Sequence, residues 1–185
     1  LSTGRIPNTE NLNLKKSGVE TDSFGFIKVD GNFRTNIENI FAIGDVIGGS
    51  MLAHKASEEG SQVIDRVLNQ NTSRDYIVPA CIYCQPEIAY VGITEQVAKE
   101  KKINYKVSQY PFKANGKSLA DDNVNGFCKI ITDESDIILG VHIIGKGCTE
   151  MISEITLVMQ NKLSIDSVIN TIHPHPTLSE IFLEA

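Results

Sequence analysis

The sequence has no excess of basic residues, no apolar run long enough to cross a membrane and no signal-peptide pattern at its N-terminus. Its 17 lysines and arginines are outnumbered by 23 aspartates and glutamates, so the formal net charge is −6. This charge argues against nucleic acid as a partner, because no basic stripe is present to neutralise phosphates. These absences predict a cytoplasmic protein that binds neither nucleic acid nor membrane.

A second pair of metal ligands is missing as well. Cys81 and Cys84 have CxxC spacing, but Cys128 and Cys148 lie 20 residues apart, whereas structural metal sites usually repeat the short spacing. Pro86 and the strand-like sequence before it predict an extended CxxC segment. In a thioredoxin-like pair the second cysteine would instead begin a helix. The sequence therefore predicts no metal site and cysteines that are buried or half-buried structural thiols.

With 41% apolar and 22% charged residues, the composition is that of an ordinary globular protein. A polar stretch at 69–75 separates two blocks, and we place the domains at 1–77 and 78–185. The opening Leu1–Arg5 is typical of the end of a buried strand, which predicts that the chain belongs to something longer. In the first block we also expect short strands at 26–29 and 40–43 and a helix over 52–68. The helix would carry one apolar stripe, formed by Ala56, Gly60, Val63, Ile64, Val67 and Leu68.

The second block shows the alternation of apolar and polar residues that is typical of strands in an antiparallel sheet. Strands are expected at 80–83, 89–92, 105–111, 126–132 and 137–144, and the Asp133–Asp136 turn would join the last two as a hairpin. Helices are expected at 95–102, 149–160 and 165–170, the second burying Met151, Ile152, Ile155 and Val158 on one stripe. Strands followed by helices on one face predict an α+β fold.

The stretch from Ile40 to Gly60 combines a buried strand, an aspartate, a Gly-rich loop and a helix. The strand ends in Gly44-Asp45, and the helix begins near Leu52. Helix N-termini attract anionic or electron-rich atoms of a ligand, and a carboxylate at a strand end can accept hydrogen bonds from sugar or ribityl hydroxyls. Equally, Asp45 could cap the turn and the glycines could make it tight. The residues alone leave both interpretations open.

The segment His173-Pro174-His175-Pro176-Thr177-Leu178-Ser179-Glu180 is the most informative for function. Proline keeps the chain extended, so an imidazole would be presented at a fixed orientation with the Glu180 carboxylate behind it. This is the arrangement that a general acid or base needs. Thr177 and Glu180 could also form a capping box at a helix start. The two interpretations are compatible.

The order and spacing of these motifs resemble the dihydrolipoamide dehydrogenases, of the pyridine nucleotide–disulfide oxidoreductase family. The matching stretches cover nearly the whole chain and are, in order, Thr3–Asn8, Phe41–Asp45, Met51–Ala56, Pro86–Glu87, Val91–Gly92, Pro111–Asn115, Gly126–Phe127, Leu139–Gly140 and His175–Glu180. The Gly-rich FAD fingerprint, the redox-active cysteine pair and the NAD-binding Gly-rich turn of the family have no counterpart here.

The resemblance implies that the chain is the C-terminal part of such an enzyme. Residues 1–77 would be the end of the NAD domain and the returning, partial α/β segment of the FAD domain. Residues 78–185 would be the interface domain, an antiparallel sheet with helices on one face, through which two subunits form a homodimer.

The implied reaction is oxidation of protein-bound dihydrolipoamide by NAD⁺ through a redox disulfide and FAD, and the implied partner is the lipoyl-bearing acyltransferase of a 2-oxoacid dehydrogenase complex. His175 would take the proton from a substrate thiol, since the thiolate is the attacking species. Glu180 would hold the imidazole and stabilise its charged form. This dyad would enter the active site of the other subunit. His175–Pro176 is a candidate cis bond, and His173 would be a supporting or surface residue.

The resemblance also implies cofactor contacts. Asp45 would bind hydroxyls of FAD, and the main chain of Met51, Leu52, Ala53 and His54 would face the flavin ring, where negative charge grows on reduction. Gly4 would lie near NAD, where a side chain would block close approach.

Two other functions remain open from the sequence. A glutathione-type reductase of the same family shares the His-Pro-Thr…Glu tail but usually lacks the Leu-Ser spacing and the preceding His-x-His, so His173-Pro174-His175 favours lipoamide. Alternatively, the isolated chain could act only as a dimerisation module without catalysis.

Overall fold

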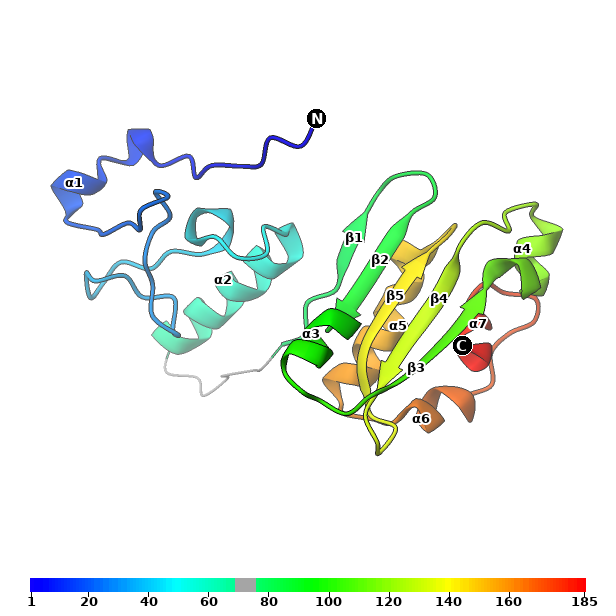
Figure 1. Cartoon of the computed structure of the whole chain (residues 1–185). Coiled ribbons are helices and arrows are strands. Elements are labelled where there is room, and N and C mark those ends of the chain that lie inside the picture. The colour runs from blue at the N-terminus through cyan, green and yellow to red at the C-terminus, as the bar shows by residue number, and fades with distance from the viewer. Residues whose placement is uncertain (69–75) are drawn as a thin grey trace. The chain divides into compact units, whose positions relative to one another are not determined.

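The structure, a computed structural model, describes residues 1–68 and 76–185 (Figure 1). The chain divides into two compact units, unit 1 (Leu1–Asp75) and unit 2 (Tyr76–Ala185). Within the described ranges, none of the helices combines the length and the apolar character that crossing a membrane requires.

Unit 2 is built on a five-stranded antiparallel sheet with the order β1-β2-β5-β4-β3. Its strands are β1 Ala80–Ile82, β2 Ile88–Gly92, β3 Lys106–Pro111, β4 Phe127–Thr132 and β5 Ile138–Ile144. All five predicted strands are confirmed to within a residue or two. The hairpin between β4 and β5 is confirmed as well, because the Asp133 carboxylate accepts the N–H groups of Ser135 and Ile137 at 2.8 and 2.9 Å and closes the turn.

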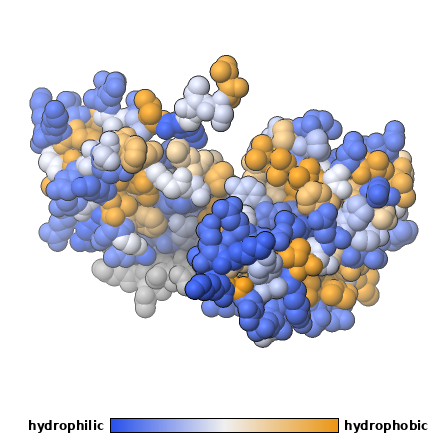
Figure 2. All heavy atoms as spheres, viewed as in Figure 1, coloured by the Kyte–Doolittle hydropathy of each residue, from blue (hydrophilic) through white to orange (hydrophobic). Residues whose placement is uncertain are grey.

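Successive side chains of a strand lie on opposite faces of the sheet, so the buried apolar set marks the face that packs against a helix. Ala89 and Val91 of β2 and Val141 and Ile143 of β5 are fully buried, and α5 (Cys148–Gln160) packs on both strands. The intervening side chains face away from α5, and Figure 2 shows apolar groups among the polar ones over the sheet. Helix α5 confirms the predicted stripe with Ile152, Ile155 and Val158 buried and Met151 half-buried. The predicted α+β class is confirmed.

Short helices complete unit 2. They are α3 Glu95–Glu100, α4 Gly116–Ala120, α6 Ile165–Ile169 and α7 Ile181–Glu184, with a 3₁₀ turn η3 at Phe112–Ala114. Thr94 caps α3 by accepting the N–H of Val97 at 3.2 Å. Helices α3 and α6 were predicted, whereas α4 was not. The core closes around Phe112, Ile181 and Phe182, all fully buried.

Unit 1 departs from the predicted strands. It contains η1 Glu10–Leu12, α1 Leu14–Ser17, η2 Gly44–Ile47 and α2 Ala53–Val67. The expected strands at 26–29 and 40–43 and the strand end at Leu1–Arg5 are wrong. Only isolated bridges form at Thr21–Ile27 and Arg34–Phe41, since residues 1–68 offer no neighbouring strand to continue a ladder.

Helix α2 confirms the predicted helix, but its apolar stripe is not buried. Ile64, Val67 and Leu68 are each more than half exposed, and Phe41, Ile43, Gly60, Val63 and Ile64 line an open apolar hollow. The side chains that α2 buries are instead Glu59 and Gln62. No element among residues 1–68 covers the stripe, whereas Glu59 is buried because it has partners, as described below.

The first testable prediction concerns the core of unit 2. Ile155→Ala should lower the free energy of unfolding by about 2–5 kcal/mol, because Ile155 is fully buried and the truncation leaves a cavity. All five tyrosines lie between Tyr76 and Tyr110, so tyrosine fluorescence during urea denaturation reports on unit 2. Ile169→Ala removes the same atoms from a site that is 48% exposed. It should change the free energy of unfolding by no more than about 0.5 kcal/mol. Equal losses in the two variants would contradict the described core.

Candidate active site

The imidazole of His175 meets the carboxylate of Glu180 in the C-terminal segment of unit 2. Nδ1 of His175 lies 2.8 Å from Oε1 of Glu180, and the His175–Pro176 peptide bond is cis, as the resemblance implied. The His175 side chain is 76% exposed, whereas that of Glu180 is 23% exposed. The carboxylate is therefore anchored while the ring faces outward.

The second carboxylate oxygen of Glu180 accepts the backbone N–H of Thr177 at 2.7 Å. This is the backward half of the predicted capping box. The forward half is wrong: α7 begins at Ile181, and the Thr177 hydroxyl donates to the Pro174 carbonyl at 2.7 Å. The Thr177 N–H, followed by the His175 ring, lowers the pKa of Glu180 below its ordinary value. Glu180 consequently stays ionised opposite His175 at neutral pH.

A buried asparagine ties this segment to the start of α4. Asn115 caps α4 by accepting the N–H of Ser118 at 3.0 Å, and its amide nitrogen donates to the Thr177 carbonyl at 3.1 Å. Asn115 also contributes to a pocket lined by Tyr110, Ala114, Asn115, Gly116, His175, Glu180 and Glu184. Sequence reasoning did not assign Asn115 to the site, although an asparagine directly before a glycine-led helix is a recognisable cap signal.

His173 has a different environment from its neighbour. Its side chain is only 5% exposed, and its two ring nitrogens contact the Glu154 carboxylate at 2.7 Å and the Thr171 carbonyl at 2.9 Å. Burial acts to lower the pKa of His173, but the hydrogen bonds to Glu154 and Thr171 and the charges of Glu154 and Glu180 outweigh it, so the pKa is raised. The His173 side chain therefore lies within the fold rather than at the surface.

The predicted cofactor residues all lie in unit 1. Asp45 belongs to η2 and forms an ion pair of 3.1 Å with Arg5; both side chains are well exposed, so the pair contributes little stability. Gly44 has φ +72°, and a Cβ there would stand 3.0 Å from the Ala56 side chain, so the turn before Asp45 requires glycine. Gly4 lies beside Arg5 with φ +76° and open space around it.

Met51 and Leu52 are half-buried, and Ala53 and His54 are exposed at the start of α2. Leu52 stands at the N-cap position, and no side chain caps the helix there. The Leu52 N–H instead donates to the Ser50 carbonyl at 2.9 Å.

Glu59 was missed by the sequence reasoning. Its carboxylate is almost fully buried, accepts the Gly44 N–H at 2.7 Å and pairs with Lys55 one helical turn earlier. The Gly44 turn, which presents Asp45, is therefore fastened to helix α2 by Glu59. The Lys-x-x-x-Glu spacing on one helix face was the available signal.

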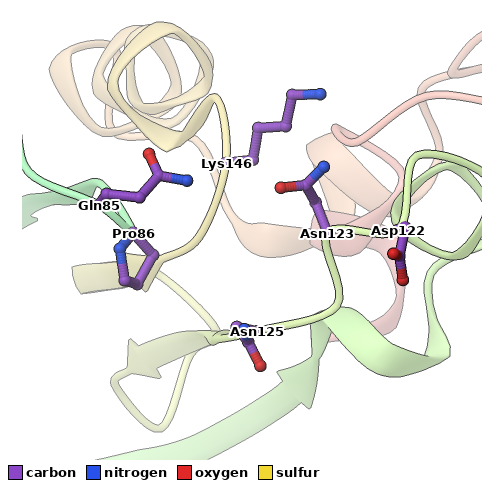
Figure 3. A pocket seen from close by; sticks show the side chains of 6 residues that line it. All are labelled: Gln85, Pro86, Asp122, Asn123, Asn125 and Lys146. Carbon is purple, nitrogen blue, oxygen red and sulfur yellow. The ribbon is translucent and has the colours of Figure 1, made fainter.

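Two further candidates are a second pocket and a metal site. A second pocket of unit 2 is lined by Gln85, Pro86, Asp122, Asn123, Asn125 and Lys146 (Figure 3), without an imidazole or a thiol among them. The described residues contain no group of three His, Cys, Asp or Glu side chains that could hold a metal ion.

The cysteines are free thiols. Burial raises the pKa of Cys128 to about 12, and burial with the Glu87 charge raises that of Cys148 to about 11, so neither is a reactive thiolate. Cys81 is half-buried as predicted. Cys84 is exposed just beyond β1, which corrects the prediction of burial for that residue.

Comparison with known proteins identifies relatives along the whole chain. Family models match the pyridine nucleotide-disulphide oxidoreductases at residues 1–60 and their dimerisation domain at residues 78–185. The dihydrolipoyl dehydrogenase of Cupriavidus necator is 43% identical over all of this chain and 40% of its own length. The mitochondrial dihydrolipoyl dehydrogenase of Sus scrofa is 45% identical over 98% of this chain and 36% of its own length.

A solved structure of a flavoprotein disulfide reductase has the same fold as this chain. The HOCl-induced flavoprotein disulfide reductase RclA of Escherichia coli superposes with a TM-score of 0.91 at 27% identity, over 98% of this chain and 42% of that one. The chain spans about two fifths of the length of the curated relatives it matches. The resemblance stated from the sequence is confirmed, and the chain belongs to the pyridine nucleotide-disulphide oxidoreductase family.

Proposed function

We propose that this chain is part of a flavoprotein that oxidises protein-bound dihydrolipoamide with NAD⁺, and that it supplies the acid–base dyad of that reaction. The observation that carries the proposal is the 2.8 Å contact between His175 and Glu180. The relatives at 41–45% identity, which are named dihydrolipoyl dehydrogenases, support the choice of substrate.

The contact determines which nitrogen of His175 performs the proton transfer. An ionised carboxylate only accepts hydrogen bonds, so Nδ1 carries the hydrogen and the neutral ring keeps its lone pair on Nε2. Nε2 then takes the proton from a substrate thiol, and the resulting thiolate attacks the redox disulfide. The Glu180 carboxylate stabilises the imidazolium that forms, and its second bond to Thr177 keeps it from turning away.

The exposure of His175 supports a role in a partner's site. A base that is 76% exposed in its own chain needs a second surface to exclude water from the reacting thiol. Residues 78–185 match a dimerisation domain. We infer that the chain forms a homodimer and that His175 enters the active site of the other subunit.

Unit 1 fits part of a flavin site. Asp45 offers an exposed carboxylate to hydroxyls of FAD. The main chain of Met51, Leu52, Ala53 and His54 at the start of α2, whose N-cap Leu52 provides no side-chain cap, would face the flavin ring. FAD supplies the electron relay between the disulfide and NAD⁺ when bound. Gly4 would contact NAD. The lipoyl-bearing acyltransferase of a 2-oxoacid dehydrogenase complex is the proposed partner. Some relatives are mitochondrial by name, so the cytoplasmic location stays a prediction.

Replacing the proposed base tests this function. In the complete enzyme, His175→Gln should lower the turnover of dihydrolipoamide by about 10²–10⁴-fold, the usual contribution of a general base, while flavin absorbance stays unchanged. His142→Gln, a histidine of β5 stacked on Tyr90, should keep near-normal turnover. Wild-type turnover in His175→Gln would show that the dyad is only structural.

The ionisation of Glu180 gives a second test. Because the pKa of Glu180 is lowered from 4.5, its stabilisation of the tail should be present above that pH and be lost as the pH falls through the folded value. A ¹³C NMR titration of the chain should give a midpoint below 4.5. His175→Gln should raise this midpoint only part of the way, since the Thr177 N–H is the larger cause. A midpoint at or above 4.5 in the wild type would contradict the described contacts.

A further inference from the structure

The side chain of His173 is held between two acceptors, two residues before the proposed base. Nε2 lies 2.7 Å from Oε1 of Glu154, which projects from α5, and Nδ1 lies 2.9 Å from the carbonyl oxygen of Thr171. With 5% of its side chain exposed, the ring is nearly sealed from water. This residue has no assigned role in the proposed reaction.

Counting hydrogens shows that this arrangement holds an extra proton. The Thr171 carbonyl can only accept, so Nδ1 must carry a hydrogen. An ionised Glu154 also only accepts, so Nε2 must carry one too, and the ring is an imidazolium. If the proton sat on Glu154 instead, the pair would still contain one proton more than a neutral histidine beside a carboxylate.

The surrounding charges favour the same state. Glu154 on α5 and Glu180 in the tail are the charged groups that act on His173, and both are acidic. In spite of burial, the hydrogen bonds to Glu154 and Thr171, together with these two charges, raise the pKa of His173 above 6.5. Loss of the proton would leave a nitrogen lone pair facing the Glu154 carboxylate, so a bond would be replaced by repulsion.

We propose that protonated His173 and Glu154 form a latch that fastens the segment 171–180 to α5 and thereby positions His175 for proton transfer. This inference rests on the proposed function of His175. His173 is a positioning residue, because both of its nitrogens are occupied and its ring is buried. The latch complements the tie from Asn115 to Thr177, which holds the same segment from the side of α4.

The sign of the pH dependence follows from the direction of the shift. A group whose pKa is raised on folding contributes stability that is fully present below its unfolded value, 6.5, and that disappears as the pH rises through the folded value. The latch should therefore be closed below pH 6.5 and should open as the pH rises through the folded pKa of His173.

The first experiment is an NMR titration of the histidine rings in this chain. The wild type should show a midpoint for His173 above 6.5, with both ring nitrogens protonated below it. Glu154→Gln should move that midpoint downward, whereas Glu150→Gln, an exposed acid on the same helix, should not. A wild-type midpoint at or below 6.5, or an unchanged midpoint in Glu154→Gln, would overturn the latch.

The second experiment measures the pH profile of the complete enzyme. Glu154→Gln and His173→Gln should lower kcat for dihydrolipoamide by about 10-fold, since a small misplacement of a catalytic group is costly. Both should also lose the decline on the alkaline side that opening of the latch adds to the profile, whereas Glu150→Gln should keep wild-type values. Thermal unfolding of each variant separates mispositioning from loss of fold.

The outcomes separate the two claims. If His175→Gln is inactive while Glu154→Gln and His173→Gln, correctly folded, keep the wild-type kcat and pH profile, the latch is wrong and the proposed function stands. If His175→Gln is fully active, the proposed function fails, and the latch loses its catalytic purpose whatever the titration of His173 gives.

Discussion

The Glu180 carboxylate is shared between the ring of His175 and the N–H of Thr177, and the proposed chemistry depends on this sharing. One oxygen fixes the tautomer of the imidazole, and the other keeps the carboxylate in place. Neither bond would hold a flexible tail alone. The tail is ordered because Ile181 and Phe182 are buried directly after Glu180 and because Asn115 holds Thr177 from the side. The hydrophobic core of unit 2 therefore sets the orientation of an exposed base.

In unit 1, a buried charge holds the candidate site in place. Glu59 is almost completely removed from water, which is tolerable only because the Gly44 N–H and the Lys55 ammonium neutralise it. This cluster fixes the turn that presents Asp45 and the start of α2. The apolar stripe on α2 stays exposed within residues 1–68. This polar cluster acts together with a small hydrophobic cluster of Val19, Ile27 and Ala42, against which Val46 and Ile47 of η2 pack.

The sheet of unit 2 could be predicted from the sequence because alternation and turn residues are local signals, and its five strands follow one another within residues 80–144. The same reasoning failed at residues 26–29 and 40–43, whose apolar runs have no neighbouring strand among residues 1–68. The dyad could be anticipated from the spacing of His175 and Glu180 and from the family resemblance. Asn115 and Glu154 could not, because they meet the tail only through tertiary contacts with α4 and α5.

The central claim, that His175 acts in the active site of the other subunit, is tested most directly with heterodimers of the complete enzyme. One subunit would carry His175→Gln, and the other would carry a serine in place of a redox cysteine. Each homodimer should be inactive. The heterodimer should regain about half of the wild-type turnover, because one of the two equivalent sites of a symmetric dimer then contains both an intact disulfide and an intact histidine. A heterodimer as inactive as its parents would contradict the account.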